Sequence, residues 1–145
     1  MHGYAQEYGP HSVICHEGDP SSDLYYLQSG KLLICTISGT QVKVIARIET
    51  GEFVGELSFF DGRPRSSHVV TLENSVVIQI PKHEISNHLP IWYLEIGKNL
   101  TKKIRLLDGV VNATNLRKFG SEENQKPLSI EDQRLFYDLL INQQN

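Results

Sequence analysis

The sequence predicts a mainly β fold that is followed by helices at its C-terminal end. Glycine-containing turn signals punctuate the first half of the chain, at Gly18-Asp19-Pro20, Ser29-Gly30, Ser38-Gly39, Thr50-Gly51 and Asp61-Gly62. Short runs rich in Val, Ile, Leu and Tyr lie between these turns, and strands at this spacing are typical of a β-sandwich or barrel. After Pro81 the apolar residues recur at helical spacing instead.

Six apolar runs are the candidate strands of the β part. They are SVICHE (12–17), DLYYLQSG (23–30), KLLICTI (31–37), VKVIARI (42–48), HVVTLE (68–73) and SVVIQI (75–80). KLLICTI is apolar on both faces, as in a strand that is covered on both sides. VKVIARI alternates in part, with Val42 and Val44 on one face. The β part is therefore expected to span about residues 12–80.

Helices are expected over about residues 81–118. The segment PKHEISNHL (81–89) reads as a short helix, and Pro90 suits the first turn of a second, longer one. In that longer helix an apolar stripe is formed by Leu100, Ile104, Leu107 and Val111. Such a stripe needs a cover, which is either the core of the domain or the seam of a homodimer.

The end of the chain predicts a linker and one more helix. Residues 120–127 are polar and include Gly120 and Pro127, which is typical of a linker. Ser129 can cap a helix that runs to Ile141, with apolar residues Leu135, Phe136, Leu139 and Leu140 buried against protein. The chain thus divides into a domain over residues 1–119 and a linker with an amphipathic helix over residues 120–145.

Composition excludes several classes of protein. The 145 residues are 39% hydrophobic and 21% charged, which suits a folded domain, and the net charge of -3 argues against a nucleic-acid-binding surface. Cys15 and Cys35 lie in apolar runs and are expected to be buried thiols in a reducing compartment. There is no apolar run of membrane-spanning length and no signal peptide, so we expect a cytoplasmic protein without a membrane span.

No pattern of catalytic or metal-binding residues stands out. The six histidines never form an H-x-H pair, and His83 and His88 are five apart, which places them on different faces of a helix. Scattered surface histidines, His68 included, are the expected explanation. The sequence has no nucleophile motif, no phosphate loop of nucleotide hydrolases and no Cys-x-x-Cys. We therefore expect neither a metal site nor an enzyme.

One segment, GELSFFDGRPRSS (55–67), combines groups that suit a ligand with a hydroxyl and an anionic group. Gly55 allows close approach to its backbone, and a helical turn that begins at Glu56 would present free N–H groups to an anion. Arg65 can donate two hydrogen bonds to a phosphate, while an ionised Glu56 accepts from a sugar hydroxyl. The alternative is a simple Glu56–Arg65 ion pair that closes the loop.

Two longer segments decide how this pattern is interpreted. EGDPSSDLYYLQSGKLLI (17–34) and GEFVGELSFFDGRPRSS (51–67) resemble the opening signature and the phosphate-binding cassette of the cyclic-nucleotide-binding domain family. That family includes catabolite activators, regulatory subunits of protein kinases and gated channels, and the resemblance covers roughly Ser12 to Asp108. It implies an eight-stranded β-roll, which is a double-stranded β-helix of jelly-roll type.

The resemblance also assigns roles to individual residues. Glu56 would accept the ribose 2′-hydroxyl, and Arg65 would bind the cyclic phosphate. The other ligand-binding residues would be Gly55, Leu57, Ser58, Ser66 and Ser67. A helix after the roll closes over the base in this family, so the base-contact candidates are Asn99, Thr101 and Lys102.

The function that follows is a non-catalytic receptor for a cyclic nucleotide. Cyclic AMP is favoured as the ligand and cyclic GMP is possible. Binding would be relayed through the C-terminal helices to an unknown effector protein, or to a homodimer interface on the helix from Pro90. No helix-turn-helix pattern follows that helix, so no nucleic-acid partner is expected. The alternative is a protein-interaction module that keeps this fold but works without nucleotide.

Overall fold

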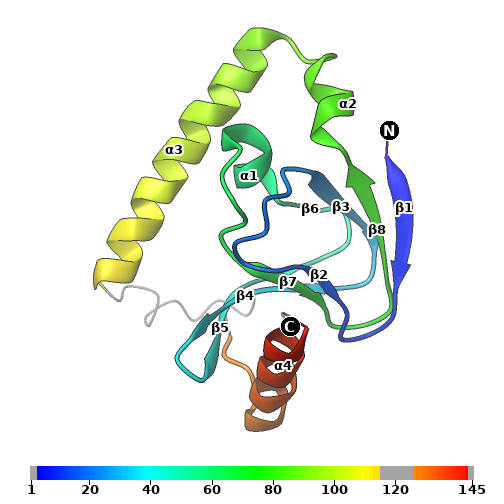
Figure 1. The fold of residues 1–145 in the computed structure, drawn as a ribbon, viewed down its shortest axis with the longest axis vertical. Coiled ribbons are helices and arrows are strands. Elements are labelled where there is room, and N and C mark those ends of the chain that lie inside the picture. The colour runs from blue at the N-terminus through cyan, green and yellow to red at the C-terminus, as the bar shows by residue number, and fades with distance from the viewer. Residues whose placement is uncertain (1–2, 115–125, 144–145) are drawn as a thin grey trace.

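The computed structural model describes residues 3–114 and 126–143 (Figure 1). Eight strands form two four-stranded antiparallel sheets, in the orders β1-β8-β3-β6 and β2-β7-β4-β5. The strands are β1 (Tyr4–Tyr8), β2 (Val13–Cys15), β3 (Leu24–Ser29), β4 (Leu32–Ser38), β5 (Gln41–Ile48), β6 (Phe53–Val54), β7 (His68–Thr71) and β8 (Ser75–Ile80). The predicted eight-stranded β-roll is therefore confirmed.

The β-roll begins earlier than the expected residue 12. Strand β1 pairs with β8 along its whole length, from Tyr4 opposite Gln79 to Tyr8 opposite Ser75. Its sequence, YAQEY, is mostly exposed because β1 is the edge strand of its sheet. An edge strand with one solvated face lacks the apolar run by which the inner strands were predicted.

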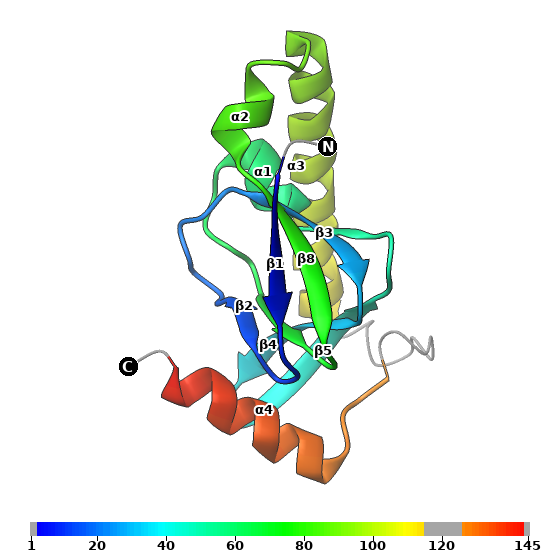
Figure 2. The same ribbon diagram turned by 90° about the vertical axis from the view of Figure 1, so that its right-hand side faces the viewer.

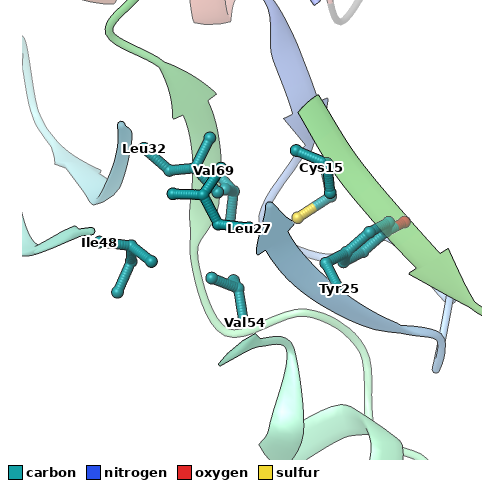
Figure 3. Close-up of a cluster of buried hydrophobic side chains, with 8 residues drawn as sticks. Cys15, Tyr25, Leu27, Leu32, Ile48, Val54 and Val69 are labelled. Atoms are coloured by element: carbon teal, nitrogen blue, oxygen red, sulfur yellow. The ribbon is translucent and has the colours of Figure 1, made fainter. Parts of the chain in front are cut away.

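The two sheets enclose a hydrophobic core (Figure 3). Its buried members come from both sheets and are Cys15, Tyr25, Leu27, Leu32, Ile48, Val54, Val69 and Val77. Side chains alternate along each strand, so Ile34 packs against this core while the neighbouring Leu33 and Cys35 belong to a second cluster on the outer face of β4. The second sheet is thus covered on both faces.

Helices α1 (Glu56–Asp61) and α2 (Lys82–Ser86) lie at one end of the β-roll, and α3 (Ile91–Thr114) runs from that end along one side of the roll (Figures 1 and 2). Helix α3 passes close to α1 at Gly97, where a Cβ atom would lie 2.1 Å from the ring of Phe60. A side chain at residue 97 would therefore displace the ring of Phe60. This close approach fixes which face of α3 turns toward the roll.

The predicted apolar stripe of α3 is not part of the hydrophobic core. Leu100, Ile104 and Leu107 are exposed, by 53%, 44% and 63%. The side chain of Val111 lies outside the described residues. The stripe was expected to be covered either by the core of this domain or by a second copy of the chain. The first expectation is wrong, because α3 contacts α1 through small and polar residues.

Helix α4 (Ile130–Asn142) packs on the outer face of the second sheet (Figure 2). The predicted cap is present, since the Asp132 amide donates to Ser129 Oγ at 3.1 Å. Phe136 and Leu140 are buried and Leu139 is half-buried, but Leu135 is 38% exposed. Burial of Leu135 was a wrong prediction: Phe136 and Leu140 face the sheet, and Leu135, about 100° around the helix from Phe136, lies at the margin of that face.

Candidate ligand-binding site

A cavity of about 600 Å³ opens between the β-roll, α1 and α3. All seven ligand-binding residues predicted from the sequence line it, and they are Gly55, Glu56, Leu57, Ser58, Arg65, Ser66 and Ser67. The apolar part of the wall comes from the two sheets and includes Tyr25, Ile34, Val54 and Val69. The cavity therefore combines an apolar floor with one compact polar rim.

Arg65 is the most strongly constrained residue of the rim. Its guanidinium is only 5% exposed. It donates to the carbonyl oxygen of Gly55 at 3.2 Å, to that of Asp23 at 2.5 Å and to Ser21 Oγ at 3.2 Å. The guanidinium also lies over the ring of Tyr25, 5.2 Å from the centroid, in a cation–π contact.

One donor of this guanidinium is unused. Within the described part of the chain, the buried Nε of Arg65 has no hydrogen-bond partner. A buried N–H without a partner is costly, so native proteins seldom leave one unless a ligand or water completes it. The Arg65 side chain is therefore held in place and still has hydrogen-bonding capacity to offer.

Gly55 is required by the position of Arg65. Its φ is +91°, a conformation that residues with a side chain rarely adopt. A Cβ atom at this position would lie 2.4 Å from Arg65 Nη1 and 3.1 Å from the carbonyl oxygen of Asp23. The glycine thus allows the guanidinium to approach the backbone at the start of α1.

The two sequence motifs meet at the backbone of Arg65. The Arg65 amide donates to the carbonyl oxygen of Asp19 at 2.9 Å, and the Gly18 amide donates to the carbonyl oxygen of Arg65 at 2.8 Å. The Asp19 side chain in turn accepts from the amide of His16 at 2.8 Å. The Glu17-Gly18-Asp19 turn therefore anchors the end of the cassette, a contact that the sequence could not predict.

Glu56 faces the cavity without pairing with Arg65. Among the described residues no ion pair joins the two side chains, so the alternative of a loop-closing ion pair is wrong. The surrounding protein raises the pKa of the Glu56 carboxyl by desolvation, although the amides of Glu56 and Gly55 act in the opposite direction. Water still reaches the side chain, because Glu56 is an exposed residue of an open cavity.

The start of α1 adds backbone donors to the rim. The first intrahelical bond runs from the Phe59 amide to the Gly55 carbonyl oxygen at 3.1 Å. The amides of Leu57 and Ser58 precede it and therefore have no partner within the helix. Together with Arg65 and the hydroxyl groups of Ser66 and Ser67, they form a set of donors that suits an anion.

Helix α3 supplies one wall of the cavity through residues other than the base-contact candidates. Arg105 and Asp108 line the cavity, whereas Asn99, Thr101 and Lys102 do not. Asn99 and Lys102 are exposed and Thr101 is buried outside the cavity lining. The spacing offered a signal, since residues 105 and 108 follow Thr101 by four and seven positions and share its face.

Arg105 also joins α3 to α1. Its Nη2 lies 3.1 Å from Asp61 Oδ1, and its Nε donates to the other carboxylate oxygen, so the pair is bidentate. Both side chains are about one-fifth exposed, at 19% and 18%. This ion pair therefore connects the part of the cavity wall formed by α3 to the C-terminal end of α1.

The histidines and cysteines gave one wrong and one correct prediction. His68 is 3% exposed, so the expected surface position is wrong, and its Nδ1 accepts from the Glu17 amide at 3.1 Å. Burial, with the neighbouring His16, lowers the pKa of His68. Cys15 and Cys35 are buried free thiols as predicted, and burial raises their pKa values to about 11 and about 12.

Two further features are absent from the described residues. Among them no group of three or more His, Cys, Asp or Glu side chains is arranged to hold a metal ion. Nor does any helix in ranges 3–114 and 126–143 have both the length and the apolar character to cross a membrane.

Comparison with known proteins gives the class that this fold and site define. The family described as "Cyclic nucleotide-binding domain" matches residues 5–89, which is more than half of the chain. The protein belongs to the cyclic nucleotide-binding domain family.

The curated relatives include a regulatory subunit and a receptor protein. A cAMP-dependent protein kinase regulatory subunit from Hypocrea atroviridis is 31% identical over 78 residues, 54% of this chain and 16% of that protein. A cyclic AMP receptor protein from Thermus thermophilus is 28% identical over 99 residues, 66% of this chain and 46% of the receptor. The chain therefore spans less than half the length of these relatives.

Solved structures share the fold. The catabolite activator protein of Thermus thermophilus matches with a TM-score of 0.63 and 24% identity, over 81% of this chain and 55% of the activator. An EAL enzyme solved with cyclic AMP and cyclic-di-GMP matches with a TM-score of 0.66 and 19% identity, over 79% of this chain and 33% of the enzyme. At these identities the likeness concerns the fold alone.

Proposed function

We propose that this protein is a non-catalytic cytoplasmic receptor for a cyclic nucleoside monophosphate. The observation that carries the proposal is the Arg65 guanidinium, which is buried beside the cavity, is held by three protein acceptors and has one N–H without a partner in the described residues. Glu56 also lines the cavity, and in the described residues it forms no ion pair with Arg65. A ligand with one anionic group and a nearby hydroxyl would use both.

The nucleotide would enter with its phosphate toward Arg65. The amides of Leu57 and Ser58 and the hydroxyls of Ser66 and Ser67 would complete the donors to the phosphate oxygens. Glu56 would accept the ribose 2′-hydroxyl, and the base would extend toward the wall formed by Arg105 and Asp108. Charge-assisted hydrogen bonds to a phosphate are among the stronger polar contacts in proteins, so Arg65 would dominate the affinity.

Calorimetric titration of the whole chain with cyclic AMP and with cyclic GMP tests this function. We expect saturable 1:1 binding of both, with the tighter dissociation constant for cyclic AMP, the nucleotide named in relatives of two different kinds. Tighter binding of cyclic GMP would reverse the choice of ligand. Absence of binding at millimolar concentrations of both would favour the protein-interaction module that works without nucleotide.

The signal would leave through α3. Helix α3 carries an exposed apolar stripe, which consists of Trp92, Ile96, Leu100, Ile104 and Leu107. These residues recur at steps of four, four, four and three, so they lie on one side of the helix. A second copy of the chain would cover such a stripe in a parallel helix seam, and an effector protein is the other candidate partner.

A charge on the stripe is expected to separate the two copies. Replacing Leu100 by glutamate would place an ionised group in the middle of an apolar seam, which costs several kcal/mol when the charge has no partner. Sedimentation velocity should show a dimer for the wild type and a monomer for Leu100→Glu. Lys102→Glu is the matched control, because Lys102 is exposed on another side of α3. A monomeric wild type would instead assign the stripe to an effector.

A further inference from the structure

The outer face of the second sheet holds the C-terminal helix of the same chain. Phe136 and Leu140 of α4 are 1% and 0% exposed, and they pack on strand residues Leu33, Cys35 and Val70. The docked helix therefore seals a continuous apolar surface. Without α4 that surface would be open to solvent.

Helix α4 also makes a specific polar contact with the edge of this sheet. The side-chain amide of Gln133 accepts from the Val42 amide at 2.8 Å and donates to the Val42 carbonyl oxygen at 2.6 Å. Strand β5 is an edge strand, so the outward backbone groups of Val42 have no neighbouring strand. Gln133 satisfies both of them, as a further strand would do.

The segment before α4 is attached to the same strand. Arg47, near the end of β5, donates through Nη1 to the carbonyl oxygen of Lys126 at 2.8 Å. Strand β5 is therefore held at both of its ends by the C-terminal segment. These contacts lie 79 and 91 residues apart in sequence, so they close long loops of the chain.

The strands under α4 are also the wall of the cavity. In β4 Leu33 and Cys35 face α4, while Ile34 between them lines the cavity. In β7 Val70 faces α4 and Val69 lines the cavity, and Ile45 of β5 lines it too. One layer of strands thus separates the docked helix from the ligand site.

We infer that α4 is a clamp on the wall of the cavity: its docking holds the β4–β5 hairpin in place, so that release of α4 weakens ligand binding. The part about ligand rests on the proposed function, whereas the part about the wall does not. A packed layer transmits displacement from one face to the other, because close-packed side chains leave little room to move independently. Binding and docking must then favour each other by the same factor.

The effect of α4 docking on the β4–β5 hairpin is measured without ligand, by amide hydrogen exchange and by alkylation of Cys35 in the full chain. We expect Phe136→Ala and the milder Gln133→Ala to accelerate exchange over Gln41–Ile48 and labelling of Cys35 by about tenfold or more, since ~1.4 kcal/mol of lost docking corresponds to tenfold. Peptide mass spectrometry separates Cys35 from Cys15. Arg134→Ala, an exposed change on the same helix, should leave both rates unchanged. Unchanged rates over β5 in Gln133→Ala would overturn the clamp.

The effect of α4 docking on ligand affinity is measured by titrating cyclic AMP into the same three variants. Phe136→Ala should raise the dissociation constant several-fold, and saturating cyclic AMP should slow Cys35 labelling of the wild type by a similar factor. An unchanged dissociation constant in a variant whose β5 exchange has accelerated would overturn the link to the ligand. A wild type that binds no nucleotide would instead defeat the proposed function, and the clamp would then be judged by the exchange rates alone.

Discussion

Replacing Arg65 by alanine is expected to weaken binding of cyclic AMP by about 1.5–3 kcal/mol or more, which is the range for a hydrogen bond to a charged group. The guanidinium is the buried cation of the rim, and its Nε is without a partner in the described residues. Calorimetry on the purified variant measures the loss. If Arg65→Ala binds as tightly as the wild type, the phosphate does not lie at this residue.

Two further variants separate loss of the contact from loss of the fold. Arg65 also donates to the carbonyl oxygens of Gly55 and Asp23, so Arg65→Ala should lower the thermal midpoint as well. Arg65→Lys keeps the charge but loses the planar fork, and we expect it to recover only part of the affinity. Arg63→Ala removes an exposed cation two residues away and should leave affinity unchanged.

The sequence could predict one side of the site because that side is contiguous. All seven predicted ligand-binding residues lie between Gly55 and Ser67 and line the cavity, since a short turn that begins a helix has few ways to fold. The other side depends on how α3 packs. Its register is set by the contact of Phe60 with Gly97 and by the pair of Asp61 with Arg105, and neither has a signature in the local sequence. The base-contact candidates therefore lie outside the cavity lining, whereas Arg105 and Asp108 are part of it.

The errors in the fold have a common physical cause. Apolar periodicity shows that a face is apolar but not what covers it, so the stripe through Leu100 was read as possible core although α3 meets the roll through Gly97. The burial of His68 could not be predicted for the same reason. Its Nδ1 accepts a hydrogen bond from the Glu17 amide, and this partner is brought close only when the chain folds. Strand β1 escaped prediction because an edge strand needs no apolar run.

Replacing Glu56 by glutamine is expected to weaken cyclic AMP binding by up to about 1.5–3 kcal/mol, because the ribose hydroxyl would lose a charged acceptor. A double-mutant cycle that combines Glu56→Gln with 2′-deoxy cyclic AMP isolates the contact between Glu56 and the 2′-hydroxyl. The wild type should lose a similar amount or more with the deoxy ligand, and Glu56→Gln should lose less than the wild type does, since both changes act on the same contact. Additive losses would show that Glu56 does not contact the 2′-hydroxyl. Glu73→Gln, in the exposed turn between β7 and β8, is the control.

The same substitution should have the opposite sign on the stability of the free protein. Desolvation by the cavity wall raises the pKa of the Glu56 carboxyl in the folded state above its ordinary value of 4.5, so the ionised form is penalised by folding. The group favours folding only below pH 4.5, and that contribution is lost as pH rises through the folded pKa. Glu56→Gln should therefore raise the thermal midpoint at pH 7 by a small amount, small because water reaches the side chain. The gain should disappear as pH falls toward 4.5, and a gain that persists there would show that charge is not its cause.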